Sequence, residues 1–169
     1  MSNINIPVFK FALRNDLDDK FIPRRGTSVS SGWDVFCAME DKGSISLRPG
    51  EYAKIPLGFR VIPPEGYWLQ LVPRSSTFAK KHLNCLYGTI DFDYRGYLVF
   101  AAQYIPDVRD LGTTLELKFG EAIGQLIPVK LQEMKVEMIS NDNFNELCLK
   151  EKNERGDGGF GSTSEKMVK

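Results

Sequence analysis

Short segments with the character of β-strands recur along this chain, and turn residues separate them. Residues 114–119 alternate strictly between polar and apolar side chains, which is typical of a strand with one buried face. The segments 48–50, 63–66 and 119–121 contain proline, which fixes φ, or glycine, which can supply positive φ. The pattern predicts an all-β fold, a β-barrel or jelly roll. Its predicted strands lie at residues 8–12, 52–55, 67–72, 97–101, 114–119, 122–129 and 135–139.

Helical patterns are confined to two short segments, residues 75–81 and 142–150, and the second opens on an Asn or Asp that can cap it. A chain of 169 residues corresponds to about one domain. After residue 150 hydrophobic residues become rare, and glycine and charged residues dominate. We therefore expect one β-barrel domain over residues 1–150 and a flexible C-terminal arm over residues 151–169.

The composition excludes several classes of partner. The 22 basic residues balance 22 acidic ones, so no global positive field attracts DNA, RNA or an anionic membrane, and a local cluster has to hold any polyanionic ligand. Cys37, Cys85 and Cys148 are widely spaced and odd in number, which favours reduced bystander thiols over disulfides or a zinc site. The sequence shows neither a signal-peptide pattern nor an apolar run long enough to span a membrane. We therefore expect a soluble protein that is cytoplasmic or otherwise intracellular.

The segment 88–96, GTIDFDYRG, combines a carboxylate and a tyrosine between two glycines, ahead of the apolar run 97–100. If Asp91 points into a pocket, it can act as a general base that polarises a water molecule, while the ring of Tyr94 packs against a flat or ring-shaped group. A solvated, Asp-rich turn of a hairpin is the other interpretation, and from these residues alone both stay open.

Four further segments occur in a fixed order around this one. They are SGWDV at 31–35, PRSST at 73–77, GEAIGQLIP at 120–128 and RGDGGFGST at 155–163. Together with residues 88–96 they match the five-motif layout of trimeric dUTP pyrophosphatases, so the chain resembles a dUTPase from about residue 23 to residue 163. The resemblance implies hydrolysis of dUTP to dUMP and pyrophosphate, which limits uracil incorporation into DNA and supplies dUMP for dTMP synthesis.

The resemblance also assigns roles to the nucleoside end of the site. Water attacks the α-phosphorus with Asp91 as its base, and the ring of Tyr94 lies under the deoxyribose, where a 2′-hydroxyl would clash. The backbone around residues 85–90, including Gly88, Thr89 and Ile90, meets the uracil edge, and Val99 lines the floor.

At the phosphate end, the resemblance places Arg74, Ser75 and Ser76 on the phosphate chain, where a guanidinium offers paired donors. A helix-capping turn is the other interpretation of these three residues. Gln125 contacts a phosphate oxygen or the attacking water. Asp34 holds water ligands of a Mg²⁺ ion that the triphosphate itself carries, and it can also form an ion pair with Arg74.

The C-terminal segment resembles the closing arm of the family. The resemblance implies that Arg155 contacts the terminal phosphates, that Phe160 stacks on uracil, and that the amides of Gly161 and Ser162 lie near the phosphates. A flexible tail without a ligand is the other interpretation. The resemblance further implies a homotrimer in which more than one chain contributes to each active site.

The chain departs from the family pattern at several positions. Ser76 stands where relatives usually carry Gly, Ala122 where a basic residue is common, and Gly124 where Ala is common. The stretch 83–88 is about one residue short, which affects the expected uracil contacts.

Two alternatives share this fold. A dCTP deaminase needs a glutamate on the strand after residues 88–96, and residues 97–102 contain no acid. A protein whose nucleotide pocket switches binding to a protein partner is suggested by apparent insertions at 105–112 and 130–153, because insertions in a compact β fold normally form surface loops. The single histidine, His82, lacks a nucleophile pattern, so we expect a packing or surface role.

Overall fold

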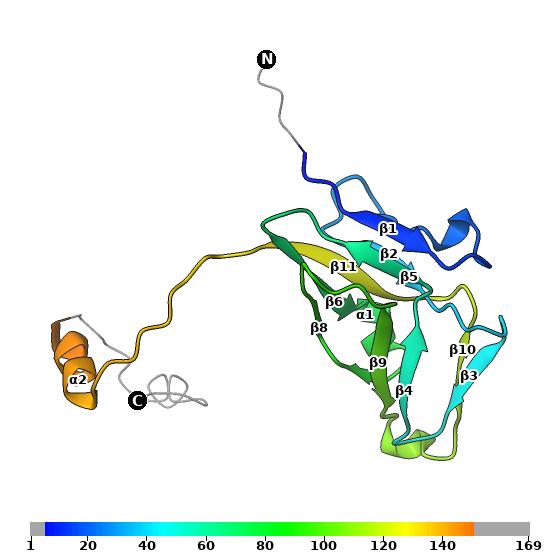
Figure 1. Cartoon of the computed structure of the whole chain (residues 1–169). Helices are drawn as coiled ribbons and strands as arrows, with labels where there is room; N and C mark the ends of the chain where they lie inside the picture. Colours follow the sequence, from blue (N-terminus) through cyan, green and yellow to red (C-terminus); the bar gives the residue numbers. More distant parts are fainter. Residues whose placement is uncertain (1–5, 151–169) are drawn as a thin grey trace. The chain divides into compact units, whose positions relative to one another are not determined.

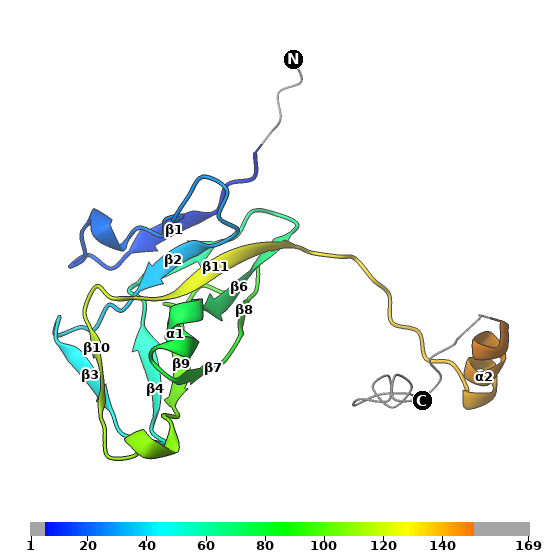
Figure 2. The same cartoon turned by 180° about the vertical axis from the view of Figure 1, so that it is seen from behind.

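The computed structural model describes residues 6–150, and most of its regular structure is β-strand (Figures 1 and 2). The strands are β1 Lys10–Leu13, β2 Trp33–Phe36, β3 Ser44–Leu47, β4 Tyr52–Pro56, β5 Phe59–Ile62, β6 Tyr67–Pro73, β7 Leu83–Cys85, β8 Gly88–Ile90, β9 Val99–Tyr104, β10 Leu115–Lys118 and β11 Ala122–Lys130. The helices are η1 Asp19–Phe21, α1 Ser75–Ala79, η2 Val108–Asp110 and α2 Asn141–Lys150. The predicted all-β fold class is confirmed.

The chain divides into two compact units, residues 1–132 and residues 133–169. The first unit holds every strand found within residues 6–150, and the described part of the second holds α2. The predicted division into residues 1–150 and 151–169 stays a prediction, because residues 151–169 lie outside the described part of the chain.

The strands of the first unit form four antiparallel sheets. Their orders are β2-β11-β6-β8, β4-β9-β7, β1-β5 and β10-β3. The long strand β11 lies between β2 and β6, as Figure 1 shows. Because β8 and β9 belong to different sheets, segment 88–96 is not the turn of a paired hairpin, and the hairpin interpretation of this segment is wrong. The segment is instead a crossover from one sheet to another.

The core fills the space between these sheets with large apolar side chains. Phe59, Phe100, Leu69, Leu117 and Ile123 come from five different strands, and each is fully buried. Burying a side chain of this size contributes about 1.5–3 kcal/mol, so the sheets are held together mainly by their inner faces. A strand with one inner face carries apolar residues at every second position, and this pattern is why segment 114–119 was predicted correctly.

One predicted strand is wrong. Residues 135–139 carry an alternating pattern, but the structure assigns them no strand. Val136 and Met138 are 102% and 96% exposed, and no described segment pairs with this stretch. Alternation reports which face a strand would bury, but it does not supply the neighbouring strand that the backbone needs for hydrogen bonds.

Both predicted helices are present, although their ends differ from expectation. The cap of α2 is Ser140, not an Asn or Asp of the helix, since its hydroxyl oxygen accepts a hydrogen bond from the Asn143 amide at 3.2 Å. Helix α1 ends before His82, which adopts a positive φ of 52° and donates its amide to the Phe78 carbonyl at 3.0 Å. His82 thus closes the turn after α1 through its backbone, and the packing or surface role expected of its side chain stays a prediction.

The apparent insertion at 105–112 forms a loop with a closed base. The Tyr104 and Thr113 hydroxyls lie 2.9 Å apart, and the Thr113 hydroxyl also donates to the Asp110 carbonyl at 2.7 Å. The tip contains η2, which Asp107 caps through its side chain. Hydrogen bonds inside the loop therefore hold its turns, and its tip is exposed.

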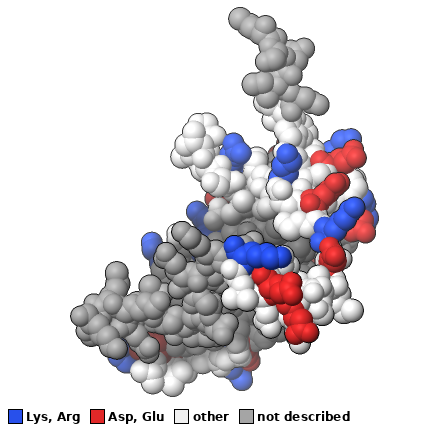
Figure 3. All heavy atoms as spheres, turned by 90° about the vertical axis from the view of Figure 1, so that its left-hand side faces the viewer, with Lys and Arg blue, Asp and Glu red and all other residues white. Residues whose placement is uncertain are grey.

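Charged residues of both signs lie side by side on the face of the molecule shown in Figure 3, in keeping with a net charge of zero. None of the helices within residues 6–150 combines the length and the apolar character that a membrane crossing would require.

Candidate active site

A small polar pocket of about 230 Å³ contains residues from three of the five motifs. Its lining includes Asp34 from β2, Arg74 and Ser75 at the start of α1, and Gln125 from β11. Backbone and hydroxyl groups of Gly26, Ser30 and Gly32 complete it. Four of the residues predicted to handle phosphate therefore lie together in the structure. Ser76 is not among the lining residues.

The strand order explains this convergence. In the β2–β11 ladder Asp34 lies opposite Gln125, so the two side chains are cross-strand neighbours. On the other side of β11, Gly124 lies opposite Pro73, the last residue of β6, and Arg74 follows directly. Three sequence segments that are more than 35 residues apart thus meet at one end of a three-strand ladder.

Asp34 and Arg74 form an ion pair across the pocket. Arg74 Nε lies 3.3 Å from Asp34 Oδ1, and the two side chains are 38% and 24% exposed. A pair this accessible to solvent contributes about 0–1 kcal/mol to stability. Its main effect is geometric, because it fixes the planar guanidinium of Arg74 beside Asp34 in the pocket lining.

Gly32 leaves room for the Gln125 amide. A Cβ built on Gly32 would lie 2.6 Å from Gln125 Oε1, so any larger residue would displace this side chain. Ser30 is fixed by Thr27, whose amide donates to Ser30 Oγ at 3.0 Å. The sequence analysis included Gly32 in a motif but missed Gly26 and Ser30, because the serines and glycines of a loop carry no periodic signal.

The segment predicted to hold the nucleoside follows an edge strand. Among the described residues β8 pairs only with β6, in a register that places Gly88 opposite Leu71 and Thr89 opposite Gln70. The other edge of β8 therefore presents backbone N–H and C=O groups that are free to pair with a flat polar ligand edge. Val99, at the start of β9, is 44% exposed.

Asp91 and Tyr94 lie in a tight turn directly after β8. The Tyr94 amide donates to the Asp91 carbonyl at 3.2 Å, and the Tyr94 hydroxyl donates to the Tyr97 carbonyl at 3.3 Å. The Asp91 side chain is exposed and forms no ion pair with a described residue, so its carboxylate is available to a ligand. A Cβ at Gly96 would lie 2.3 Å from the Tyr94 hydroxyl, so the glycine permits this ring position.

Segment 88–96 and the polar pocket are separate features of the chain. No residue of segment 88–96 lines the pocket that contains Arg74 and Gln125. The following strand β9 has the sequence VFAAQY and contains no acid, as expected from the sequence. The predicted residues therefore form two groups, one suited to phosphate and one suited to a base and a sugar.

The ring of Phe100, on β9, explains why position 124 carries glycine. A Cβ at this position would lie 2.8 Å from Phe100 Cε2 and 3.0 Å from the Val72 carbonyl oxygen. The Phe100 ring is completely buried and cannot withdraw. The bulk of this ring thus accounts for glycine where relatives commonly carry alanine, whereas the structure gives no comparable account of Ala122.

Two of the three cysteines are shielded from ionisation by burial. All three are free, as expected. Burial raises the pKa of the Cys37 thiol to about 12, and the nearby Glu121 carboxylate adds to this effect. Burial also raises the pKa of Cys85 to about 11. Both thiols therefore stay protonated at neutral pH and are poor nucleophiles.

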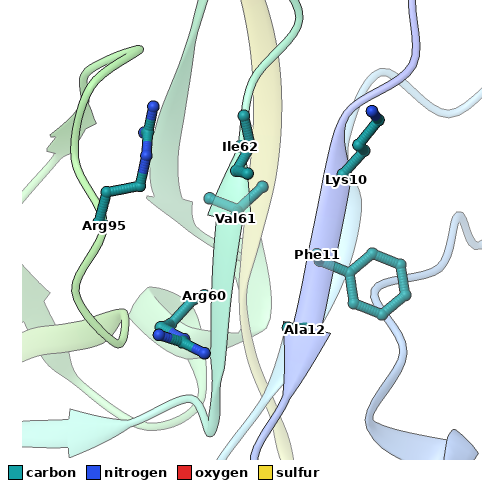
Figure 4. A pocket seen from close by; sticks show the side chains of 7 residues that line it. All are labelled: Lys10, Phe11, Ala12, Arg60, Val61, Ile62 and Arg95. Carbon is teal, nitrogen blue, oxygen red and sulfur yellow. The ribbon is translucent and has the colours of Figure 1, made fainter.

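A second pocket, of about 270 Å³, lies against β1 and β5, and it combines apolar side chains with three basic ones (Figure 4). Lys10, Arg60 and Arg95 line it, and no acidic side chain does. In Figure 4, Arg95 comes from a loop beside the strand that carries Val61 and Ile62. The two pockets share no lining residue, and the sequence analysis did not predict this one.

Comparison with known proteins assigns the family. The dUTPase family model matches residues 18–164. Deoxyuridine 5′-triphosphate nucleotidohydrolase of Hydrogenobaculum sp. (strain Y04AAS1) is 32% identical over 159 residues, which cover 93% of this chain and 99% of that protein. The chain belongs to the dUTPase family. The enzyme of the same name from Arabidopsis thaliana is 31% identical over 90% of this chain and 82% of its own length.

Solved dUTPase structures share the fold. The dUTPase of Staphylococcus bacteriophage 80alpha with dUPNHPP superimposes with a TM-score of 0.72 and 25% identity, over 92% of this chain and 97% of that one. A mutant dUTPase of phage phi11 of S. aureus has a TM-score of 0.65 and 24% identity over 79% and 97%, and its description names a structural Mg(II) ion.

The residues present fit a magnesium ion carried by substrate. Within residues 6–150 no group of three or more His, Cys, Asp or Glu side chains is placed to hold a metal, so the pocket itself contributes one carboxylate, Asp34. Mg²⁺ binds one or two carboxylates and keeps its other positions for phosphate oxygens and water, which matches this donor set. Arg155, Phe160, Gly161 and Ser162, assigned to the closing arm, lie outside the described residues.

Proposed function

We propose that this protein hydrolyses dUTP to dUMP and pyrophosphate at a site assembled from more than one copy of the chain. Membership of the dUTPase family and the activity named for its relatives support the reaction. The observation that supports shared sites is the separation of the two groups of residues. Arg74, Asp34 and Gln125 line one pocket, whereas Asp91 and Tyr94 lie outside it.

In this proposal the pocket binds the phosphate chain. Arg74 donates paired hydrogen bonds to phosphate oxygens, Ser75 adds a hydroxyl, and the Gln125 amide orients an oxygen of the substrate or the attacking water. When Mg²⁺ is bound, it neutralises charge on the phosphates, and Asp34 holds it through water. The net charge of the chain is zero, so local donors supply this recognition.

The nucleoside end binds to a second copy. The free edge of β8 offers backbone groups to the uracil edge, and Tyr94 packs against the deoxyribose. Asp91 accepts a proton from water as the water oxygen bonds to the α-phosphorus. The bond from that phosphorus to the bridging oxygen of the β-phosphate breaks, and pyrophosphate leaves with its electron pair.

A matched pair of variants tests the role of the base. Asp91→Asn should reduce kcat for dUTP by about 10²–10⁴-fold while binding of a non-hydrolysable dUTP analogue stays largely intact. Asp93→Asn removes an exposed carboxylate two residues away and should leave kcat within about twofold. Pyrophosphate release from each dNTP with Mg²⁺ measures both effects. An Asp91→Asn variant with wild-type turnover removes Asp91 from the reaction.

Mixed oligomers test the sharing of sites. Asp91→Asn and Arg74→Ala are each expected to be inactive alone. If one site takes Asp91 from one copy and Arg74 from another, refolding the two variants together at equal ratio leaves about a quarter of the sites intact, because each wild-type residue is present with probability of about one half. If both residues of a site come from the same chain, the mixture stays inactive. Light scattering should give the mass of a trimer.

A further inference from the structure

Strand β11 contains an irregularity two residues before Gln125. Its register with β2 shifts between Ala122 and Gly124, so Ile123 is an extra residue that has no partner on β2. A β-bulge of this kind changes the direction in which the following side chains point, and bulges are common beside active sites. The orientation of Gln125 toward the phosphate pocket therefore depends on how this bulge is held.

Thr77 holds the bulge from helix α1. Its hydroxyl donates to the Ile123 carbonyl at 2.6 Å, and its side chain is completely buried. The other described donor to this carbonyl is the Arg74 amide at 3.5 Å, a long contact. The hydroxyl of Thr77 is satisfied by this one contact.

A second contact joins the turn that follows α1 to the turn that precedes β11. Lys81 Nζ forms an ion pair with the Glu121 carboxylate, and the two side chains are 20% and 30% exposed. The other oxygen of this carboxylate accepts from the Lys118 amide at 3.1 Å, and the Glu121 carbonyl accepts from the Cys37 amide at 2.8 Å. Glu121 is thus fixed by the neighbouring turn, and Lys81 is attached to a rigid anchor.

We infer that Thr77 and Lys81 are positioning residues that fix the distance between Arg74 and Gln125. Arg74 and Ser75 lie at the start of α1, and Gln125 lies on β11, so the two walls of the phosphate pocket belong to different elements. Thr77 joins α1 to β11 directly, and Lys81 joins the turn after α1 to the residue before β11. This inference rests on the proposed function, because the pocket matters only if it binds a phosphate chain.

The test compares Thr77→Val with Thr77→Ser. Valine keeps the volume of threonine but has no hydroxyl, whereas serine keeps the hydroxyl. We expect Thr77→Val to weaken binding of inorganic pyrophosphate with Mg²⁺ and to lower kcat for dUTP by about tenfold each, since small misplacements of positioned groups have effects of this size. Thr77→Ser should restore both within about threefold, and deoxyuridine binding should not change in either variant.

A purely structural role predicts a different result. In that case Thr77→Val lowers the melting temperature but leaves kcat and the pyrophosphate affinity at wild-type values well below that temperature. Leu117→Val, in a different sheet, is the matched control for a loss of stability without an effect on the pocket. If Thr77→Val does not fold, Lys81→Met and its conservative counterpart Lys81→Arg repeat the comparison from the second contact.

The outcomes separate the two claims. If the wild-type protein does not hydrolyse dUTP, the proposed function fails, and the pyrophosphate affinities still test the positioning role. If the wild type is active and Thr77→Val matches it in kcat and pyrophosphate affinity, the positioning role is refuted.

Discussion

The contact between Gly124 and Phe100 predicts a large effect for a single methyl group. In Gly124→Ala the new Cβ would lie 2.8 and 2.9 Å from two ring carbons of Phe100 and 3.0 Å from the Val72 carbonyl oxygen. Neither the buried ring nor the strand backbone can move away easily. Overpacking of this kind costs about 1–3 kcal/mol.

The backbone conformation offsets only part of this cost. Gly124 does not have a positive φ, so alanine restricts the unfolded chain and returns about 0.4–1 kcal/mol. We expect a net loss of about 1–2 kcal/mol in the free energy of unfolding, or about 2–8 °C in Tm for a chain of this size. Urea denaturation at fixed protein concentration measures it, because the stability of an oligomer depends on concentration.

Two comparisons decide whether the reasoning holds. At Gly112 a new Cβ meets no atom within 4 Å, so Gly112→Ala should be neutral or slightly stabilising. Phe100→Leu removes the clashing ring atoms. The double variant Phe100→Leu, Gly124→Ala should therefore have a free energy of unfolding about 1 kcal/mol higher than the two single-variant losses, added together, predict. Equal stabilities for Gly124→Ala and Gly112→Ala, or simple additivity in the double variant, refute the explanation.

Further predictions concern the tyrosine and the buried thiol. Tyr94→Ala should lower the ratio of kcat/KM for dUTP to kcat/KM for UTP, because an open pocket no longer excludes the 2′-hydroxyl. An unchanged ratio would mean that the sugar is recognised elsewhere. Gly96→Ala should narrow the same ratio without removing the ring, since its Cβ would lie 2.3 Å from the Tyr94 hydroxyl and force the ring to turn. Cys37 stays protonated in the folded protein up to a pKa of about 12, whereas its ordinary value is 9.0. The unfolded thiol therefore ionises first as pH rises above 9, and the wild type should lose on the order of 1 kcal/mol more than Cys37→Ala between pH 8 and pH 10. Parallel pH profiles for the two proteins would contradict this.

Much of the fold could be predicted because it depends on local patterns. Strict alternation identified residues 114–119, and the apolar segments 67–72 and 122–129 correspond to β6 and β11. The strands of three or four residues, such as β7 and β8, are too short to carry a period. Residues 135–139 satisfy the pattern without a neighbouring strand, because pairing is a property of the whole sheet.

The sequence predicted which residues form the candidate site, but not which contacts hold them in place. The motif layout identified Asp34, Arg74 and Gln125, and the structure brings them to one pocket. The sequence does not reveal that the hydroxyl of Thr77 satisfies a bulge 46 residues further along the chain. It also does not reveal the clash that makes Gly124 necessary. Both depend on contacts between residues that lie far apart in the chain.

The closed base of the loop at residues 105–112 makes this loop a natural place for protein engineering. The Tyr104 and Thr113 hydroxyls meet at 2.9 Å, so the two residues that flank the loop are joined through their side chains. A fluorescent tag or a short glycine linker could replace the tip without stretching the strands on either side. The same replacement would separate catalysis from any binding of a protein partner by this loop, since none of its residues lines the phosphate pocket. The enzyme could thus be made to report its own location while its chemistry stays intact.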